Sequence, residues 1–370
     1  MLDSDSNSDV EIPEPEEIER FQQALLGWFR DCGKDYPWRN TSDPYAILVS
    51  ELMLQQTQIV TVLKKGYFTR WLRKFPDWES LASAQEEEIL KAWEGLGYYN
   101  RARNLQKAAK VICQDYEGVV PRDVDLLQSL PGVGRYTAGA VMSFAFNQRA
   151  PIVDGNVVRV LARLFAYGEP VDTPKSSRLI WEWADQLTPV GGARDYNSAI
   201  MELGQRICVR SAPACESCPV SNWCRGRRDG IESSLPRKKA KAAVTRLKER
   251  VGIAVRAGRV FLVKEASRRR KGLWRLPEIQ ENMADDLLEA FRFDYSITRY
   301  RVNLRVFEAP ESLFEGMIAE GVGGWYGMES DEELPPLGAP YLRAIQKYNK
   351  FQSELSGANE DLEVNKSKIH

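Results

Sequence analysis

The chain has 370 residues, with 51 lysines or arginines, 52 aspartates or glutamates and a formal net charge of −1 at pH 7. This length allows two domains, each with its own core, and the balanced charge does not by itself indicate a nucleic-acid partner. No apolar run approaches the roughly 18 residues that a membrane helix needs, and no signal-peptide pattern opens the chain, so we expect a soluble cytoplasmic protein outside the membrane.

The first 19 residues contain eight acidic residues, no basic residue and two prolines. A segment of this composition cannot bury a core, so residues 1–17 are predicted to form a disordered acidic tail. From residue 18 to residue 228, apolar residues recur at helical spacing between short loops marked by Pro, Gly and Asp. This region is therefore predicted to be all-α.

A helix is expected to begin at Asp43-Pro44, because aspartate favours the N-cap and proline favours the first helical position. Glu51 follows in the middle of this helix, among leucines such as Leu48 and Leu52. A glutamate at such a position most often lies on a polar face of the helix. If it lines a cleft instead, desolvation raises its pKa and suits it to donate a proton.

The segment from Gly95 to Asn100 holds a pair of tyrosines, Tyr98 and Tyr99, and arginines follow at once. The pair is either buried at the start of a helix or exposed. Exposed aromatic rings beside arginines can enter a base stack while the guanidinium groups hold the nucleic-acid backbone.

A tight hairpin between two helices is predicted for Leu130-Pro-Gly-Val-Gly134. Pro131 ends the first helix, and Gly132 and Gly134 are expected to adopt backbone conformations that other residues avoid. The apolar spacing that follows predicts a second helix, whose exposed N-terminus can bind an anion such as a DNA phosphate. Asp154 stands at the start of the next amphipathic segment.

Six cysteines are present, and four of them fall within 17 residues. This density favours metal ligation over disulfides. Four thiolates can hold either zinc or a [4Fe–4S] cluster, and a single loop with unequal C-x6-C-x2-C-x5-C gaps fits the cluster better. The four candidates are Cys208, Cys215, Cys218 and Cys224.

Between residues 225 and 250, ten lysines or arginines stand against three acidic residues. Residues 229–245 are expected to form a basic interdomain linker, which is either simply solvated or also contacts phosphate. Residues 246–350 alternate apolar and polar side chains in short runs and predict a small α+β domain with a closing helix over 341–354. Residues 351–370 are polar and are expected to form a loose tail.

Together these motifs resemble those of the helix-hairpin-helix DNA glycosylases, and specifically the MutY family of adenine glycosylases. The resemblance covers roughly residues 21–348. It implies a six-helix lobe with the hairpin, a second lobe with an iron-sulfur ([4Fe–4S]) cluster, and a MutT-like (NUDIX-like) domain after the linker. The implied activity is base excision repair: adenine paired with 8-oxoguanine or guanine in double-stranded DNA is flipped out and its N-glycosidic bond is hydrolysed.

The resemblance also implies roles for four residues. Glu51 would protonate adenine N7, and Asp154 would remain ionised to stabilise the positively charged sugar, with Asn156 and Tyr136 assisting. Cleaving an N-glycosidic bond calls for such a pair, because the leaving base needs a proton and the sugar needs a nearby negative charge. Two carboxylates in different environments can hold these opposite protonation states at neutral pH.

An adenine pocket is likewise implied, with Ser198 standing where many family members have Glu or Gln. Recognition of adenine is therefore expected to rest more on Trp38, Arg39 and a water. The expected pocket residues are Trp38, Arg39, Leu54, Ser198 and Met201.

Contacts to DNA are implied on both sides of the duplex. Gln56 and Tyr98 match residues that fill the gap and wedge beside the flipped base, which helps to offset the cost of flipping. The hairpin glycines Gly132 and Gly134 match a phosphate contact. The family's Phe-Ser-His loop, which recognises 8-oxoguanine, aligns with residues 297–300, so either Thr298 or Arg299 is the candidate donor.

Endonuclease III relatives carry a lysine after the hairpin, where this chain has Arg135 and Tyr136. A covalent amine mechanism then lacks its nucleophile, so a monofunctional glycosylase is expected. We expect a monomer, associated with the nucleoid if the cell is bacterial, which can meet repair partners through its linker. The alternatives are an endonuclease III-like pyrimidine or mismatch-thymine glycosylase and a catalytically silent damage-binding protein.

Overall fold

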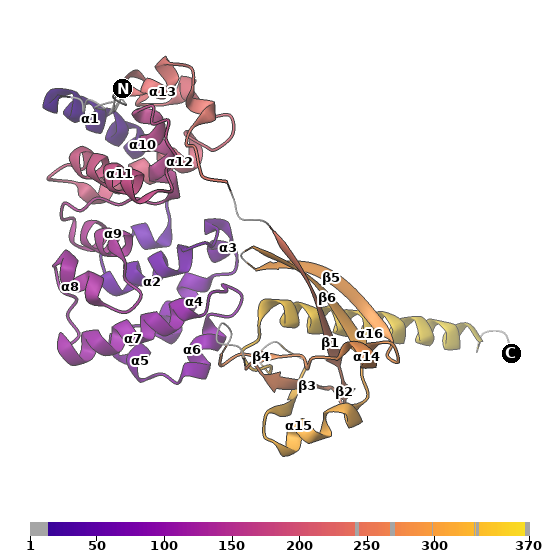
Figure 1. Ribbon diagram of the computed structural model, residues 1–370. Helices are drawn as coiled ribbons and strands as arrows, with labels where there is room; N and C mark the ends of the chain where they lie inside the picture. The colour runs from indigo at the N-terminus through magenta and orange to yellow at the C-terminus, as the bar shows by residue number, and fades with distance from the viewer. Residues whose placement is uncertain are drawn as a thin grey trace, which may run out of the picture. The chain divides into compact units, whose positions relative to one another are not determined.

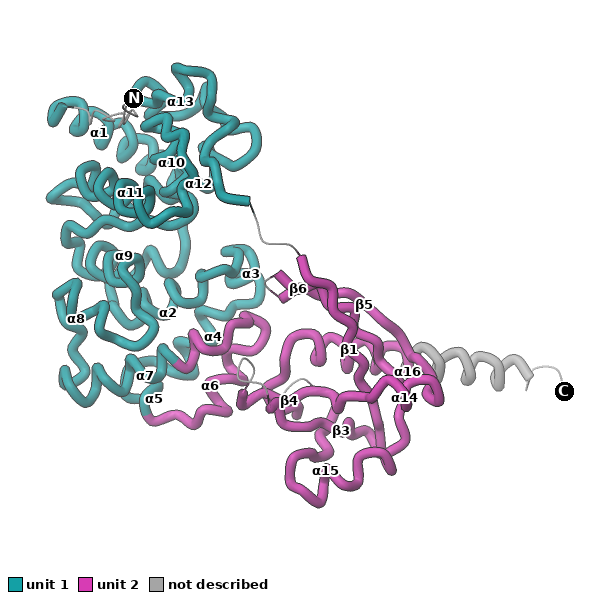
Figure 2. The backbone as a smooth tube through the Cα atoms, viewed as in Figure 1, with its two compact units in different colours: residues 1–82, 104–240 teal, residues 83–103, 241–370 magenta. Residues whose placement is uncertain are grey.

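The structure is a computed structural model that describes residues 14–240, 244–266, 271–297, 299–328, 330 and 333–366. The chain divides into two compact units, drawn in different colours in Figure 2. Unit 1 comprises residues 1–82 and 104–240, and unit 2 comprises residues 83–103 and 241–370. Unit 2 therefore takes the segment 83–103, which the sequence pattern assigns to the helical region.

Unit 1 is built of helices joined by short loops (Figure 1). None of the helices in the described ranges has the length and hydropathy that a membrane span requires. The helices are α1 (Pro15–Cys32), α2 (Pro44–Leu54), α3 (Ile59–Lys64), α4 (Tyr67–Lys74), α5 (Trp78–Ser83), α7 (Asn100–Asp115, which begins in unit 2), α8 (Val124–Ser129), α9 (Arg135–Phe146), α10 (Gly155–Leu164), α11 (Pro174–Leu187), α12 (Ala193–Arg206) and α13 (Arg225–Arg228), with short 3-10 turns at η1 (Pro37–Arg39), η2 (Cys215–Ser217), η3 (Ser221–Trp223) and η4 (Glu232–Ser234).

The first helix starts earlier than the sequence analysis expects. Residues 1–17 were predicted to be disordered, but α1 begins at Pro15 and includes Glu16 and Glu17. Proline suits the first helical position, and acidic side chains in the first turn interact favourably with the helix dipole. The same proline and acidic residues that cannot form a core therefore favour the start of a helix at Pro15.

Helix α1 packs against the last helices of unit 1 rather than against its neighbours in sequence. Phe21 and Leu25 of α1 lie in one buried cluster with apolar residues of α10, α11 and α12. Elsewhere in the unit α2 packs on α9, and α9 also contacts α12. This arrangement brings α2, α9, α10 and α12 together around the site described below.

The hairpin predicted at residues 130–134 joins α8 to α9. Gly132 has φ +82°, and a Cβ there would lie 2.6 Å from the Cβ of Asn104, so glycine is required at this position. Gly134 is the N-cap of α9 with φ −95° and ψ 179°, which is extended backbone open to any residue. The expectation that both glycines need forbidden conformations is therefore wrong for Gly134.

Unit 2 combines two small sheets with helices. Sheet one has the order β1-β6-β5, with β1 parallel to β6 and β5 antiparallel to β6; in sheet two β3 pairs with β2, β4 and β7. Its elements are α6 (Glu86–Ala92), β1 (Thr245–Ile253), β2 (Val255–Arg256), β3 (Arg259–Lys264), β4 (Trp274–Arg275), α14 (Glu281–Ala284), β5 (Glu289–Ile297), β6 (Tyr300–Glu308), η5 (Glu311–Phe314), α15 (Glu315–Ala319), β7 (Gly323–Gly327) and α16 (Ala339–Lys366).

The closing helix is longer than expected. The sequence predicts a helix over 341–354 and a loose tail over 351–370, whereas α16 continues to Lys366. After Pro340 near its start the helix contains no further proline. Glu and Leu recur in its second half, and these residues have high helix propensity. A polar segment is expected to be exposed to solvent, but its polarity alone does not end a helix.

Candidate active site

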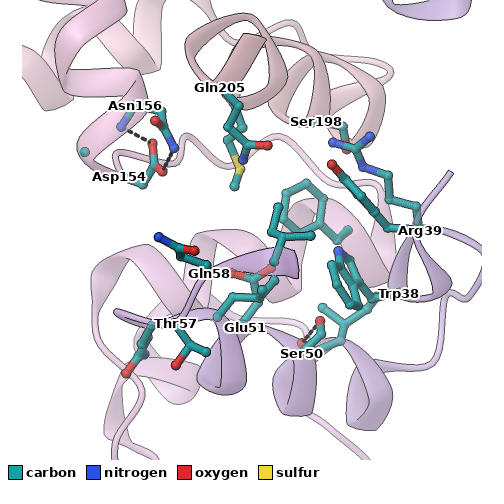
Figure 3. A pocket seen from close by; sticks show the side chains of 18 of the residues that line it. Trp38, Arg39, Ser50, Glu51, Thr57, Gln58, Asp154, Asn156, Ser198 and Gln205 are labelled. Carbon is teal, nitrogen blue, oxygen red and sulfur yellow. Dashed lines mark hydrogen bonds between the residues drawn. The ribbon is translucent and has the colours of Figure 1, made fainter. Parts of the chain in front are cut away.

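A cavity of about 820 Å³ opens in unit 1. It is lined by residues of η1, of α2 and the loop that follows it, and of α3, α9, α10 and α12. Figure 3 shows side chains that line it. The cavity brings together all the catalytic and adenine-pocket residues that the sequence analysis names: Trp38, Arg39, Glu51, Leu54, Tyr136, Asp154, Asn156, Ser198 and Met201.

Glu51 lies in the middle of α2, and its side chain reaches the cavity. Asp43 caps this helix as expected, because its carboxylate accepts the backbone N–H groups of Tyr45 at 3.0 Å and Ala46 at 3.3 Å. Residues 45–53 are all buried, so α2 has no polar face, and Glu51 itself is only 6% exposed. The alternative that Glu51 lies on a polar, solvated face of the helix is therefore wrong.

Burial raises the pKa of Glu51 to about 7. This value includes a lowering by the hydrogen bond from the Tyr136 hydroxyl and a smaller rise from the negative charge of Asp154. The same hydroxyl lies 3.9 Å from Sδ of Met201, but a carboxylate is a much stronger acceptor than a thioether. Glu51 is thus a carboxyl group that is close to half protonated at neutral pH.

Asp154 faces the cavity from the N-terminus of α10. Its Oδ1 accepts the backbone N–H groups of Asn156 at 2.9 Å and Val157 at 2.7 Å, and its Oδ2 accepts Nδ2 of Asn156 at 2.7 Å. Burial raises the pKa of Asp154 above its usual value, and these three hydrogen bonds and the nearby Arg159 offset part of that rise. Because the bonds favour the anion, Asp154 ionises more readily than Glu51.

Asn156 links Asp154 to a third side chain, Arg159. Its Oδ1 accepts Nη2 of Arg159 at 2.8 Å, and the same guanidinium donates to the carbonyls of Gly204 at 2.5 Å and Cys208 at 2.7 Å. A Cβ at Gly204 would lie 2.7 Å from the Cβ of Asn156, so a glycine lets α12 approach α10 at this point. The hydrogen bonds of Arg159 therefore join Asn156 to the start of the cysteine loop.

Trp38 and Arg39 form one wall of the cavity. The Trp38 ring stacks on Tyr36 at 5.3 Å between centroids and meets Phe68 edge to face at 5.7 Å. The Arg39 guanidinium lies 4.8 Å from the centroid of the Tyr36 ring, and it donates to the Lys34 carbonyl at 2.7 Å. Both side chains are therefore held in place by aromatic packing.

Glu202 of α12 lies beside the cavity wall and is not expected there from the sequence. Its side chain is fully buried, and it accepts hydrogen bonds from Arg39, from Arg206 at 2.7 Å and from the Lys34 N–H at 2.9 Å. Burial raises the pKa of Glu202, but the bonds from Arg39 and Arg206 bring it below its usual value. The i, i+4 spacing of Glu202 and Arg206 on one helix could have predicted their ion pair from the sequence. Nothing in the sequence predicts the pairing of Glu202 with Arg39.

Replacing Glu202 with glutamine should destabilise unit 1 by about 3 kcal/mol, because two arginines lose their buried counter-charge. Urea unfolding measures this change. The Asp195→Asn variant removes an exposed carboxylate from the same helix and serves as the control, with an expected change of less than about 0.5 kcal/mol. Equal stability of the two variants would contradict a structural role for Glu202.

The DNA-contact residues named from the sequence lie in different parts of the chain. Gln56 follows α2 at the mouth of the cavity, is exposed and has φ +57°. Gly132 and Gly134 are exposed at the hairpin of unit 1. Arg299 is exposed at the β5–β6 turn of unit 2, with its guanidinium 5.2 Å from the Tyr300 ring, and Thr298 lies outside the described residues.

The tyrosine pair separates into one buried and one exposed ring. Tyr99 is buried and donates to the Leu337 carbonyl at 2.8 Å within unit 2, whereas Tyr98 is 50% exposed and has φ +48°. The buried Arg101 guanidinium lies 5.7 Å from the Tyr98 ring and donates to the Leu96 carbonyl at 2.9 Å. Burial lowers the pKa of Arg101 to about 10, and the group still remains charged at neutral pH.

Replacing Tyr98 with alanine should weaken binding to mispaired duplex DNA by about 10- to 100-fold, since an exposed ring stacked on a base contributes on the order of 1–3 kcal/mol. Fluorescence anisotropy with a labelled duplex measures the effect. Phenylalanine at the same position keeps the ring and should bind like the wild type. Wild-type affinity of the alanine variant would exclude a stacking role for Tyr98.

The four cysteines form a loop between α12 and α13. All four are partly exposed, and the fully buried Arg163 donates to Sγ of Cys208 at 3.3 Å and to the carbonyls of Val209 at 2.7 Å and Arg210 at 3.0 Å. Among the described residues no group of three or more Cys, His, Asp or Glu side chains is arranged to hold a metal ion.

The cysteine side chains of this loop nevertheless have the chemistry of metal ligands. Burial and, to a smaller extent, the nearby Cys208, Cys224 and Cys215 raise the pKa of Cys218 to about 11. Backbone N–H groups of Val220 at Cys218 and of Arg227 and Gly226 at Cys224 oppose this by bonding to the sulfurs. Thiolates that repel one another and accept N–H groups are the donor set expected around a metal cluster.

Comparisons with known proteins agree with this geometry. A family model described as HhH-GPD superfamily base excision DNA repair protein matches residues 49–186. The rat adenine DNA glycosylase is 43% identical over 232 residues, which cover 60% of this chain and 45% of the rat protein. The adenine DNA glycosylase of Mycolicibacterium smegmatis is 42% identical over 208 residues, 56% of this chain and 69% of that protein.

A solved structure is also similar. A thermostable thymine-DNA glycosylase matches with a TM-score of 0.53 and 34% identity, over 58% of this chain and 98% of that one. The matched part of this chain spans less than half the length of the rat relative.

Proposed function

The chain belongs to the adenine DNA glycosylase family within the HhH-GPD superfamily of base excision DNA repair proteins, and from this membership we propose that it excises adenine mispaired with 8-oxoguanine or guanine. The observation that carries the proposal is the carboxylate pair in one cavity. Glu51 is buried with a raised pKa, and Asp154 is held by three hydrogen bonds that favour its anion.

The reaction breaks the bond between C1′ of the deoxyribose and N9 of adenine. Glu51 gives its proton to N7, so the bonding electron pair leaves with a neutral base. The ionised Asp154 stabilises the positive charge that develops on the sugar, and it does so without reorganising because its hydrogen bonds already fix it. Water then adds its oxygen to C1′, and its proton restores Glu51.

Two neighbours position this pair. Tyr136 bonds to Glu51, and Asn156 bonds to Asp154, so each carboxyl group has a defined orientation in the cavity. Trp38 and Arg39 offer an apolar face and a donor to a planar base, while Ser198 is too short to replace a Glu or Gln contact. We infer that adenine is held mainly by the Trp38–Arg39 wall.

No lysine lines the cavity in the described part of unit 1, and Arg135 and Tyr136 follow the hairpin. We therefore infer a monofunctional enzyme. Incubation with an A:8-oxoguanine duplex should produce abasic sites that become strand breaks only after alkali. Nicking without alkali, or covalent trapping by borohydride, would favour the endonuclease III-like alternative.

A [4Fe–4S] cluster held by Cys208, Cys215, Cys218 and Cys224 fits the donor set of the loop. When bound, such a cluster supplies iron–thiolate bonds that tie the loop to the end of α12, and it can carry one electron. Arg163 orients the loop through its bonds to Cys208, Val209 and Arg210. A brown colour and iron in elemental analysis would support the cluster, and zinc would contradict it.

We further infer that unit 2 is a MutT-like domain that recognises 8-oxoguanine, with Arg299 as the donor at the β5–β6 turn. Replacing Arg299 with alanine should reduce the preference for A:8-oxoguanine over A:G by about tenfold, the effect of losing one good base contact. Single-turnover rates on both duplexes measure the ratio. An unchanged ratio would leave Arg299 without this role.

A further inference from the structure

One face of the β1-β6-β5 sheet in unit 2 carries six arginines or lysines and one aspartate among its nine paired positions. The register aligns three rows of residues across β1, β6 and β5. These rows are Arg246–Arg301–Ser296, Lys248–Asn303–Asp294 and Arg250–Arg305–Arg292. Paired residues of neighbouring strands share a face, so these nine side chains project from the same side of the sheet. We call this side the basic face.

The opposite side of the sheet is part of the core of unit 2. Leu304 and Val306 of β6 lie in one buried cluster with Tyr341 and Ile345 of α16, which crosses this side of the sheet (Figure 1), and Val302 of β6 is also buried. The basic face therefore points away from the core. Arg246 and Lys248 on the edge strand β1 are exposed, and so is Arg301 on the central strand β6.

Acidic groups neutralise only one end of the basic face. Arg305 pairs with Glu289 at 2.5 Å, and Arg250 pairs with Glu281. Asp294 is bonded to Asn303 at 2.6 Å. At the other end no carboxylate among the described residues pairs with Arg246, Lys248 or Arg301.

An unneutralised arginine pair on neighbouring strands is costly for the fold. Arg246 and Arg301 are direct partners in the β1–β6 ladder, and like charges directly opposite one another destabilise a sheet. An anion placed between them removes that repulsion.

We propose that the basic face binds the phosphate backbone of duplex DNA through Arg246, Lys248 and Arg301, independently of base sequence. The face carries no aromatic side chain on which unpaired bases could stack, so the backbone of a duplex suits it better than a single strand. The proposal builds on the DNA-repair role proposed above and adds a second DNA-binding surface, separate from the cavity of unit 1.

The test uses the full chain and an undamaged 30-base-pair duplex of mixed sequence. The variant R246Q/K248Q/R301Q removes three charges from the basic face, and R259Q/K264Q/K350Q removes three charges from exposed positions elsewhere in unit 2. Fluorescence anisotropy gives the dissociation constant at several salt concentrations. Three lost phosphate contacts should reduce the slope of log K against log salt by about 2.7 and weaken binding at least roughly tenfold at low salt, with little change in the control.

Base release at saturating enzyme separates this proposal from the proposed function. The basic-face variant should release adenine from an A:8-oxoguanine duplex at the wild-type rate, which also shows that it is folded. If wild-type protein releases no adenine, the glycosylase proposal fails, while the salt slopes still decide the present one. Equal slopes of log K against log salt in both triple variants would overturn the proposal. Polyglutamate serves as a second probe. If the basic-face variant kept its DNA affinity but lost binding to polyglutamate, the face would bind an acidic protein and the proposal would also be overturned.

Discussion

The Glu51→Gln variant is expected to release adenine about 10³-fold more slowly than the wild type while binding mispaired DNA equally well. Glutamine keeps the shape of the side chain but has no acidic proton to give to the base, and general acid catalysis contributes on the order of 10²–10⁴ in rate. Single-turnover base release measures the loss. The exposed Glu182→Gln on α11 is the matched control and should retain full activity.

The same substitution should change the pH profile in a defined direction. Base release by the wild type needs Glu51 protonated, so its rate should fall as pH rises above about 7, the pKa of this group. It also needs Asp154 ionised, so the rate should fall again at acid pH. The residual activity of Glu51→Gln should lose the alkaline fall and keep the acidic one.

Stability provides a further readout of Glu51. Because burial raises its pKa from 4.5 to about 7 in the folded state, the folded protein is penalised as the carboxyl group ionises. The penalty is absent below pH 4.5, grows between these values and is complete above pH 7. Glu51→Gln should therefore be more stable than the wild type at pH 8, by up to about 3 kcal/mol. A wild-type rate, or a loss of stability, would contradict the role of Glu51.

The Asp154→Asn variant is the second large effect. Removing the negative charge beside the developing positive sugar should slow base release by about 10³-fold, since preorganised electrostatic groups contribute this much. Asparagine is also a good N-cap, so α10 should remain folded and lose less than about 1 kcal/mol. A low rate in a folded variant therefore reports chemistry.

Asp123→Asn is the natural control for this substitution. Asp123 caps α8 by accepting the N–H groups of Asp125 and Leu126, both at 2.9 Å, and it does not line the cavity. The two variants share the same loss of an N-cap carboxylate, but only Asp154→Asn should lose activity. If both variants retained wild-type base release, Asp154 would not be the stabilising carboxylate.

Features that depend on neighbouring residues could be predicted from the sequence. The N-cap Asp43 and the hairpin glycine Gly132 both follow from local backbone preferences. The two ends of the chain were predicted less well. A helix start at Pro15 and a helix that continues to Lys366 both lie in polar segments, where composition says little about backbone conformation.

Features that depend on distant segments could not be predicted. Spacing alone leaves Glu51 on a polar face, because nothing in the sequence of α2 reveals that residues 45–53 are all buried. Glu202 is bonded to Arg39, 163 residues away, and Arg159 reaches Cys208 across 49 residues. Only the family resemblance placed Glu51 and Asp154 in one cavity, and the fold of unit 1 provides the physical reason.

The most direct test of the proposed function is the identity of the base that the wild-type protein releases. A panel of duplexes with A, G, T or C opposite guanine and opposite 8-oxoguanine should be compared under single-turnover conditions. We expect release of adenine opposite both guanines, faster opposite 8-oxoguanine, and no release of pyrimidines. Preferential release of thymine opposite guanine, as the name of the similar solved structure would suggest for that protein, would contradict the proposed function.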